Sequence, residues 1–134
     1  MKRVKRAAES NAEPTKGELA VLQVLWQHGP STVRFVHDMV NEGKEATQYT
    51  STLKLMQLMA EKGMLGRDES SMKHVYYPML EERGTKGHLL NKFIDTMYQG
   101  SVENMMIALL GNEKTSREDL RKIKELLGEM EKKG

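Results

Sequence analysis

The chain has 134 residues, no cysteine and a formal net charge of +2 at pH 7. This length suits one domain, or one small domain with an appendage. The absence of cysteine excludes disulfides, thiolate metal sites and cysteine nucleophiles, and it is typical of the reducing cytosol. No apolar run approaches the roughly 18 residues of a membrane span, and no apolar stretch follows the charged N-terminus as in a secretion signal. We therefore expect a cytoplasmic protein without membrane contacts.

Residues 1–13 have no apolar period, and we expect them to form a disordered arm. Residues 1–16 contain five basic and two acidic side chains, a local balance of +3, whereas residues 81–134 contain ten of each. A basic arm of this kind often contacts nucleic-acid phosphates. The alternative is a solubilising tail or an expression remnant. The candidate phosphate contacts in this arm are Lys2, Arg3, Lys5 and Arg6.

Two helices are predicted before residue 44. The first begins with a capping-box spacing, in which Thr15 and Glu18 satisfy each other's backbone donors, and it ends at Gly29-Pro30. The second begins near Ser31-Thr32 and ends at Asn41-Glu42-Gly43. Apolar residues recur in both at helical spacing, so each helix is expected to bury one face.

A third helix is predicted from about Thr47 to Lys62, and its residues separate into two sides at about 100° per residue. The apolar side contains Tyr49, Thr52, Leu53, Met56, Met59 and Ala60. The polar side contains Thr47, Thr50, Ser51, Lys54, Gln57 and Glu61. Short hydroxyl side chains permit close approach to a DNA groove, and Lys54 and Gln57 supply donors for phosphates or base edges. An ordinary solvated face is the alternative, but the single carboxylate, at the far end of this side, favours DNA.

A β-hairpin is predicted next, from Met64 to Arg67 and from Lys73 to Tyr77, with Pro78 closing it. Three helices followed by a hairpin within about 65 residues is the order of a winged helix, a helix-turn-helix variant. Because a wing commonly lies along the DNA backbone, its basic residues are candidate phosphate contacts. His74 by itself is more typical of a surface histidine than of a ligand or a switch. The candidates are Arg67, Lys73 and His74.

Residues 81–134 are predicted to form three helices with strong apolar faces, separated by Gly100-Ser101 and by Gly111-Asn112. About 50 residues of this kind rarely form a self-sufficient core, so pairing with a second copy is a natural way to bury them. The alternative is a three-helix subdomain that packs on the first domain. The candidate dimer contacts are Val102, Met105, Met106, Leu109, Leu110, Leu120, Ile123, Leu126, Leu127 and Met130.

The sequence lacks the motifs of common enzymes and metal sites. His28, His37 and His88 are scattered singly, and there is no Gly-rich phosphate loop, G-x-S-x-G motif or convergent carboxylate pair. We therefore expect no enzymatic activity, no cofactor and no metal. The predicted fold is mainly α with a small β-hairpin: a basic arm at 1–13, a winged-helix DNA-binding domain at 14–80 and a helical dimerisation region at 81–134.

Four segments carry a more specific signal. They are Gly17 to Trp26 with Gly29-Pro30, Tyr49 to Lys54 with Met56 and Glu61 to Gly63, His74 to Pro78, and Gly100-Ser101 with Asn112 to Lys114. In these segments, and from residue 14 to about residue 130, the chain resembles the penicillinase repressor family of winged-helix transcriptional regulators. Each motif is weak alone, but four in the right order are more specific.

The resemblance implies a dimeric repressor that occupies a palindromic operator in double-stranded DNA. By analogy with the family, Thr50, Ser51, Lys54 and the wing residues from Arg67 to His74 face DNA, and the last two helices form the homodimer. One branch of the family is relieved by copper bound to C-terminal cysteines, which this chain lacks.

Another branch of the family is relieved when a regulatory protease cuts the helix before the final one. The corresponding position is near Ala108-Leu109, but the asparagine-aromatic pair typical of that cut is missing. A ligand is the alternative means of release. The alternative function is a winged helix that binds proteins, as a module or adaptor, and it predicts an apolar patch in place of the polar side of the third helix.

Overall fold

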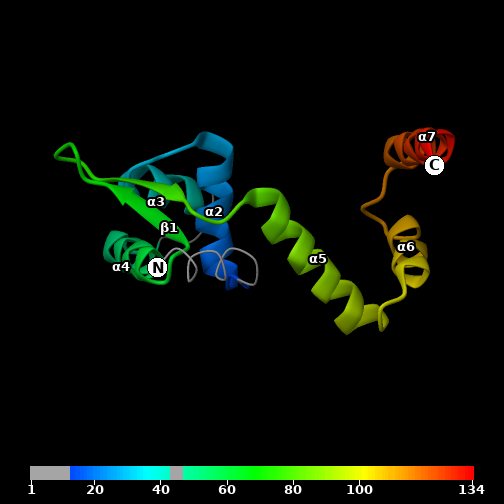
Figure 1. Ribbon diagram of the computed structural model, residues 1–134, viewed down its shortest axis with the longest axis horizontal. Coiled ribbons are helices and arrows are strands. Elements are labelled where there is room, and N and C mark those ends of the chain that lie inside the picture. Colours follow the sequence, from blue (N-terminus) through cyan, green and yellow to red (C-terminus); the bar gives the residue numbers. More distant parts are fainter. Residues whose placement is uncertain (1–12, 43–46) are drawn as a thin grey trace. The chain divides into compact units, whose positions relative to one another are not determined.

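The structure is a computed structural model that describes residues 13–42 and 47–134. The candidate phosphate contacts Lys2, Arg3, Lys5 and Arg6 lie outside the described residues, as does Gly43. The elements, in chain order (Figure 1), are α2 (Lys16–His28), α3 (Val33–Val40), α4 (Tyr49–Glu61), β1 (Leu65–Asp68), β2 (Val75–Pro78), α5 (Glu82–Tyr98), α6 (Val102–Leu110) and α7 (Arg117–Lys133). The prediction of a mainly α fold with a small hairpin is confirmed.

The chain forms two compact units, Met1–Leu89 and Leu90–Gly134, and the boundary between them falls within α5. The first unit contains α2, α3, α4 and the hairpin. The second contains the C-terminal half of α5 together with α6 and α7. The assignment of residues 14–80 to DNA binding and of residues 81–134 to dimerisation stays a prediction.

The core of the first unit lies where α2, α3 and α4 pack on the hairpin. Complete burial of one such apolar side chain contributes about 1.5–3 kcal/mol to folding, so this cluster supplies the main stabilisation of the unit. At its edge, the indole N–H of Trp26 donates to the carbonyl of Leu80 at 3.0 Å. The most buried apolar side chains are Val21, Leu22, Leu25, Val36, Met56, Met59, Tyr76 and Leu80.

The first helix begins and ends as its sequence predicts. The backbone N–H of Thr15 donates to the carboxylate of Glu18 at 2.9 Å, and the N–H of Glu18 donates to the hydroxyl of Thr15 at 3.2 Å. This reciprocal capping box satisfies two N–H groups that have no partner within the helix. At the other end, Gly29 has φ +85°, a conformation that favours glycine.

The two predicted sides of α4 are confirmed by burial. All six residues of the apolar side are buried or half-buried, and every described residue of the polar side is exposed. One boundary differs, because the helix begins at Tyr49 and Thr47 precedes it. The N–H of Thr47 donates to the side-chain oxygen of Asn41 at 3.0 Å, which holds this residue in the connection from α3.

The hairpin is antiparallel and pairs Arg67 with Tyr76 and Asp68 with Val75. Three predicted strand residues lie outside the strands: Met64 precedes β1, and Lys73 and His74 lie in the loop that precedes β2. The physical reason is local hydrogen bonding: the N–H of Ser70 donates to the carboxylate of Asp68 at 2.9 Å, and the hydroxyl of Ser71 donates to the carbonyl of Lys73 at 2.8 Å. Such side-chain bonds compete with a strand ladder. Pro78 is the last residue of β2, paired with Leu65, rather than the residue after the strand.

A short third segment joins the hairpin to the helices. Ser31, in the turn between α2 and α3, forms an isolated antiparallel bridge with Tyr76. The N–H of Ser31 donates to the carbonyl of Tyr76 at 2.9 Å, and the N–H of Tyr76 donates to the carbonyl of Ser31 at 2.8 Å. These two bonds fix β2 of the hairpin against the turn that precedes α3.

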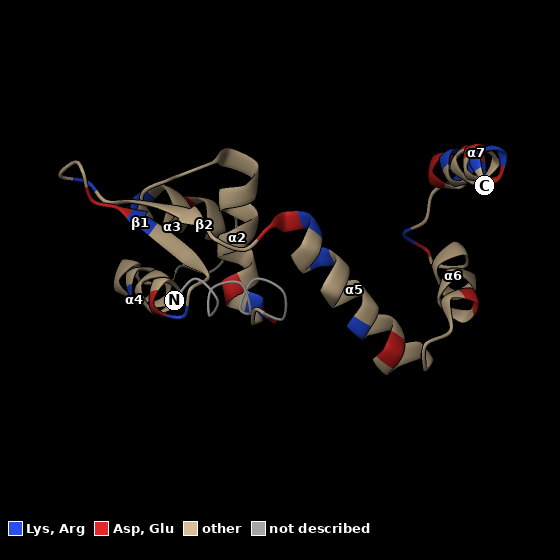
Figure 2. Cartoon of the chain, viewed as in Figure 1, with Lys and Arg blue, Asp and Glu red and all other residues tan. Residues whose placement is uncertain are grey.

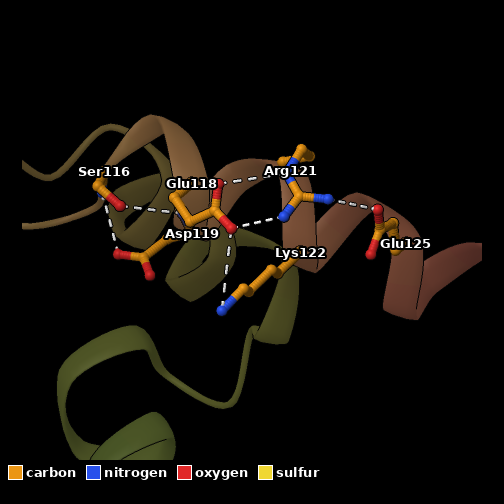
Figure 3. A network of polar contacts seen from close by, with 6 residues as sticks. All are labelled: Ser116, Glu118, Asp119, Arg121, Lys122 and Glu125. Carbon is orange, nitrogen blue, oxygen red and sulfur yellow. Dashed lines mark hydrogen bonds and ion pairs between the residues drawn. The ribbon is translucent and has the colours of Figure 1, made fainter.

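The helices α6 and α7 of the second unit have side-chain caps at their N-termini, but they bury little apolar surface. The hydroxyl of Ser101 accepts from the N–H of Asn104 at 3.0 Å at the start of α6. Ser116 and Asp119 form a capping box at the start of α7, beside a network of ion pairs on the helix surface (Figure 3). The structure describes every residue of α6 and α7, and none of them is buried.

Candidate nucleic-acid interface

The exposed side of α4 presents short polar side chains. Thr50, Ser51, Lys54 and Gln57 are all exposed, and they are backed by the buried residues Thr52 and Met56 on the opposite side of the helix. Lys54 makes no ion pair with any residue that the structure describes. A helix with a packed back and small exposed donors has the form that close approach to a DNA groove requires.

A groove of about 420 Å³ lies beside α4, between this helix, the start of α3 and the hairpin. Four sequence-predicted residues line it: Gln57, Arg67, Lys73 and His74. The other predicted residues do not line it. Thr47 lines a separate cavity of about 200 Å³ near the start of α2, and Thr50, Ser51 and Lys54 lie on the open surface of α4.

The groove also contains a cation that sequence reasoning missed. Arg34, near the start of α3, places its guanidinium carbon 4.3 Å from the centre of the Tyr49 ring, the first residue of α4. Its Nη1 lies 3.7 Å from a carboxylate oxygen of Asp38, with both side chains 62% exposed. An ion pair this long and exposed contributes little, so Arg34 keeps most of its capacity to bind an anion. In the sequence, the only indication that Arg34 could bind an anion is that a basic residue lies on the polar side of α3.

Arg67 is held more firmly. Its guanidinium carbon lies 5.9 Å from the centre of the Tyr76 ring, its Nη1 donates to the Tyr76 hydroxyl at 3.4 Å, and it pairs with Glu69. The hydrogen bond with Tyr76 and the negative charge of Glu69 raise the pKa of Arg67 above its ordinary value, against the opposing effect of desolvation. Figure 2 shows basic residues on β1 and on the loop that follows it. Lys73, in this loop, is exposed.

A partly buried polar network positions the first turn of α4. Thr52, which is 7% exposed, has its hydroxyl 2.8 Å from Nδ1 of His37 on α3. The amide nitrogen of Asn41 donates to the carbonyl of His37 at 2.7 Å and lies 3.1 Å from the same Nδ1, while its oxygen accepts from the N–H of Thr47. These partners fix the orientation of the Asn41 amide, with its oxygen toward Thr47 and its nitrogen toward His37. The network thus joins α3 to α4 directly behind the exposed side.

The other end of α4 is attached to α2. Nζ of Lys62 lies 2.6 Å from the carboxylate of Glu18, a residue that is only 4% exposed. Burial raises the pKa of Glu18, but the hydrogen bonds and charge of Lys62 and the hydrogen bonds from Thr15 outweigh it, and the pKa is lowered overall. The carboxylate is therefore ionised at neutral pH and holds both helices.

Two further findings concern the described residues alone. No helix within them is both long and apolar enough to cross a bilayer. No group of three or more His, Asp or Glu side chains is gathered there as a metal site would require.

Comparisons with known proteins agree with this arrangement. Residues 14–129 match the sequence profile of the family described as Penicillinase repressor. A Penicillinase repressor from Bacillus licheniformis is 25% identical over 114 residues, which cover 84% of this chain and 87% of that protein. The structure of a MarR family protein from Bacillus stearothermophilus superimposes with a TM-score of 0.50 and 17% identity, covering 98% of this chain and 83% of that one. This last likeness concerns the fold alone, and it supports the winged helix.

Proposed function

The chain belongs to the penicillinase repressor family and is thus a DNA-binding transcriptional regulator, and we propose that it acts as a dimeric repressor on a palindromic operator. The observation that carries this proposal is the exposed side of α4, where Thr50, Ser51, Lys54 and Gln57 lie over a packed core and beside a basic groove. In this proposal α4 enters the major groove and the hairpin contacts the backbone. The family is one of repressors and not of enzymes.

Dimerisation is supported by the apolar surface of the second unit. Side chains of α6 and α7 that a soluble monomer would be expected to cover are strongly exposed, for example Val102 at 57%, Leu126 at 57% and Met130 at 67%. Exposed apolar surface of this kind is typical of an interaction site. Two copies related by a dyad would present their α4 helices to half-sites about one helical turn, roughly 34 Å, apart or a multiple of it.

Release by cleavage of the tail is part of the proposal. Ala108 and Leu109 are both exposed in α6, and a cut there would remove α7 and leave the first unit intact. Two linked DNA-binding units bind cooperatively, because the second contact forms at a high effective concentration; separating them reduces affinity by about 10²-fold or more. A ligand that acts on the first unit is the alternative.

The release proposal is tested with a fragment of residues 1–108. We expect a folded, largely monomeric protein that binds the operator far more weakly than the intact chain does. Sedimentation and binding titrations measure the two properties. Operator binding by the fragment as tight as that of the intact chain would show release by cleavage to be wrong and would favour a ligand.

The function itself is tested by mapping the binding sites of the protein across the genome. We expect sites with an inverted repeat, upstream of genes whose transcription rises when the protein is removed. The protein-binding alternative predicts no enrichment of DNA sites, and it also requires an apolar patch where α4 exposes Thr50, Ser51 and Lys54. Absence of sequence-specific sites would refute the proposed function.

A further inference from the structure

The charged side chains that line the groove beside α4 are all basic. It contains Arg34 from α3, Arg67 from β1 and Lys73 and His74 from the loop before β2, and none of its lining residues is Asp or Glu. All of these residues lie in the part of the chain that the structure describes. A groove lined in this way has the potential of an anion-binding site.

The cations that line the groove differ in how far other residues already engage them. Arg67 is already engaged by Tyr76 and Glu69. Arg34 stacks on the Tyr49 ring, and its one ion pair with a described residue is the long contact with Asp38. Lys73 makes no ion pair with any described residue. The two available cations therefore lie on different elements of the fold, one on α3 and the other on the hairpin loop.

The groove is continuous with the exposed side of α4. Gln57, which lines it, follows Thr50 by seven residues and so lies on the same line along the helix. The groove also has an apolar portion, formed by Val33, Leu53 and Met72. A ligand that fits this groove carries negative charge, extends along α4 and has an apolar part of about the size of a sugar. A sugar–phosphate strand has these properties.

A second cavity, of about 660 Å³, lies between the C-terminal part of α4 and the hairpin and provides an internal comparison. It shares Gln57 and Arg67 with the groove, but it is also lined by Glu61 and Glu69. Two carboxylates disfavour a phosphate in this second cavity. The groove is therefore distinguished from the second cavity as a phosphate site by the sign of its charge and not by its size.

We propose that the groove holds one sugar–phosphate strand of the duplex that α4 contacts, with Arg34 and Lys73 binding its phosphates from opposite walls. This inference rests on the proposed function, because it places the backbone of the same DNA. It assigns a phosphate-binding role to Arg34, outside the recognition helix and the hairpin. The groove would thereby set the depth and tilt of α4, since both walls contact the same strand.

The test compares the full-length protein with its Arg34→Gln, Lys73→Gln and double variants on a mixed-sequence duplex over a range of salt concentrations. Removing one cation from a phosphate lowers the slope of log affinity against log salt by about 0.9. We expect that reduction from each single variant and about twice as much from the double variant. Arg83→Gln is the matched control, because Arg83 is exposed in α5 and does not line the groove; its slope should equal that of the wild type.

An unchanged slope for Lys73→Gln, in a protein that still binds DNA, would overturn the groove proposal and leave the proposed function standing. Lys73 lies in an exposed loop, so this variant tests the groove even where Arg34→Gln loosens its contact with Tyr49 and lowers the melting temperature. A wild-type protein that binds no duplex would overturn the proposed function itself.

A second arm distinguishes the duplex backbone from a free phosphate ligand. Pyrophosphate is titrated into the complex against sodium chloride of equal ionic strength. Equal displacement by the two salts supports the backbone as the occupant. Displacement by pyrophosphate at much lower ionic strength, lost in the Arg34→Gln variant, would overturn it in favour of a small phosphorylated molecule.

Discussion

At the scale of single residues, the contact between Glu18 and Lys62 makes the stability of the first unit depend on pH. The pKa of Glu18 is lowered in the folded protein from an ordinary value of 4.5, so the folded state binds this proton less readily than the unfolded state does. The stabilisation is therefore present above the unfolded pKa and is lost as the pH falls through the lower folded pKa. The buried partner is the carboxylate, since the side chain of Lys62 is 54% exposed.

We predict that Lys62→Met lowers the free energy of unfolding by about 1–2 kcal/mol at neutral pH, because a buried carboxylate loses its cation while the exposure of Lys62 moderates the loss. The difference from wild type should shrink in acid, as Glu18 becomes protonated. Urea unfolding at a series of pH values measures both. The control is Lys86→Met, which removes an ion pair of equal length whose two side chains are about half exposed. A difference that persists unchanged in acid would contradict the assignment to Glu18.

Two threonines on α4 separate stability from DNA binding. The hydroxyl of Thr52 is bonded to His37 inside the network behind the helix, whereas Thr50 is exposed on the side proposed to contact DNA. Thr52→Val should lower the free energy of unfolding by about 1 kcal/mol, the usual effect of losing one buried hydrogen bond. Thr50→Val should leave stability unchanged and weaken operator binding. Thermal unfolding and binding titrations measure the pair, and equal effects of both variants on stability would contradict the proposed division of roles.

Residue-level predictions from the sequence succeed where the cause is local. The capping box at Thr15 and Glu18 and the two sides of α4 depend on spacing within one helix, and spacing is visible in a sequence. The proposed role of Arg34 and the link from His37 to Thr52 depend on the packing of α3 against α4 and on the hairpin, which join residues distant along the chain. No single-helix pattern contains that information.

At the scale of elements, the hairpin depends on a close contact between its two strands. Gly66 pairs with Tyr77, and the Tyr77 ring occupies the space that a Cβ on Gly66 would need. We predict that Gly66→Ala lowers the free energy of unfolding by about 1 kcal/mol, because the half-exposed ring must move aside. In a Tyr77→Ala background the same substitution should be close to neutral, and this double-mutant cycle isolates the contact. If Gly66→Ala lowered the free energy of unfolding by the same amount in the Tyr77→Ala background, the strain would not come from the contact between Gly66 and the Tyr77 ring.

Boundaries of elements are where the sequence is least informative. The hairpin is recognisable from its Val- and Tyr-rich return segment, yet Lys73 and His74 lie in the loop because the side chains of Asp68 and Ser71 satisfy backbone groups locally. The difference matters for function. In the loop, both side chains can approach α3 and line the groove together with Arg34.

At the scale of the whole molecule, the second unit should determine the oligomeric state. Leu126→Asp would bury an unpaired charge in the proposed interface, at a cost of several kcal/mol, so we predict a monomer with much weaker operator binding. Lys124→Asp, at a position of the same helix that is not among the proposed dimer contacts, should remain dimeric. Sedimentation analysis measures both. A wild-type protein that is monomeric at micromolar concentration and binds its operator normally would refute the dimer.

The exposed apolar faces of α6 and α7 have a consequence for how sharply the regulated genes respond. If two copies must pair before they bind, the amount of active repressor at low abundance grows with the square of the number of chains rather than in proportion to it. Halving the supply of chains then lowers operator occupancy by up to about fourfold, by mass action. In the proposed dimer, these faces would thereby convert a modest loss of protein into a steep rise in transcription.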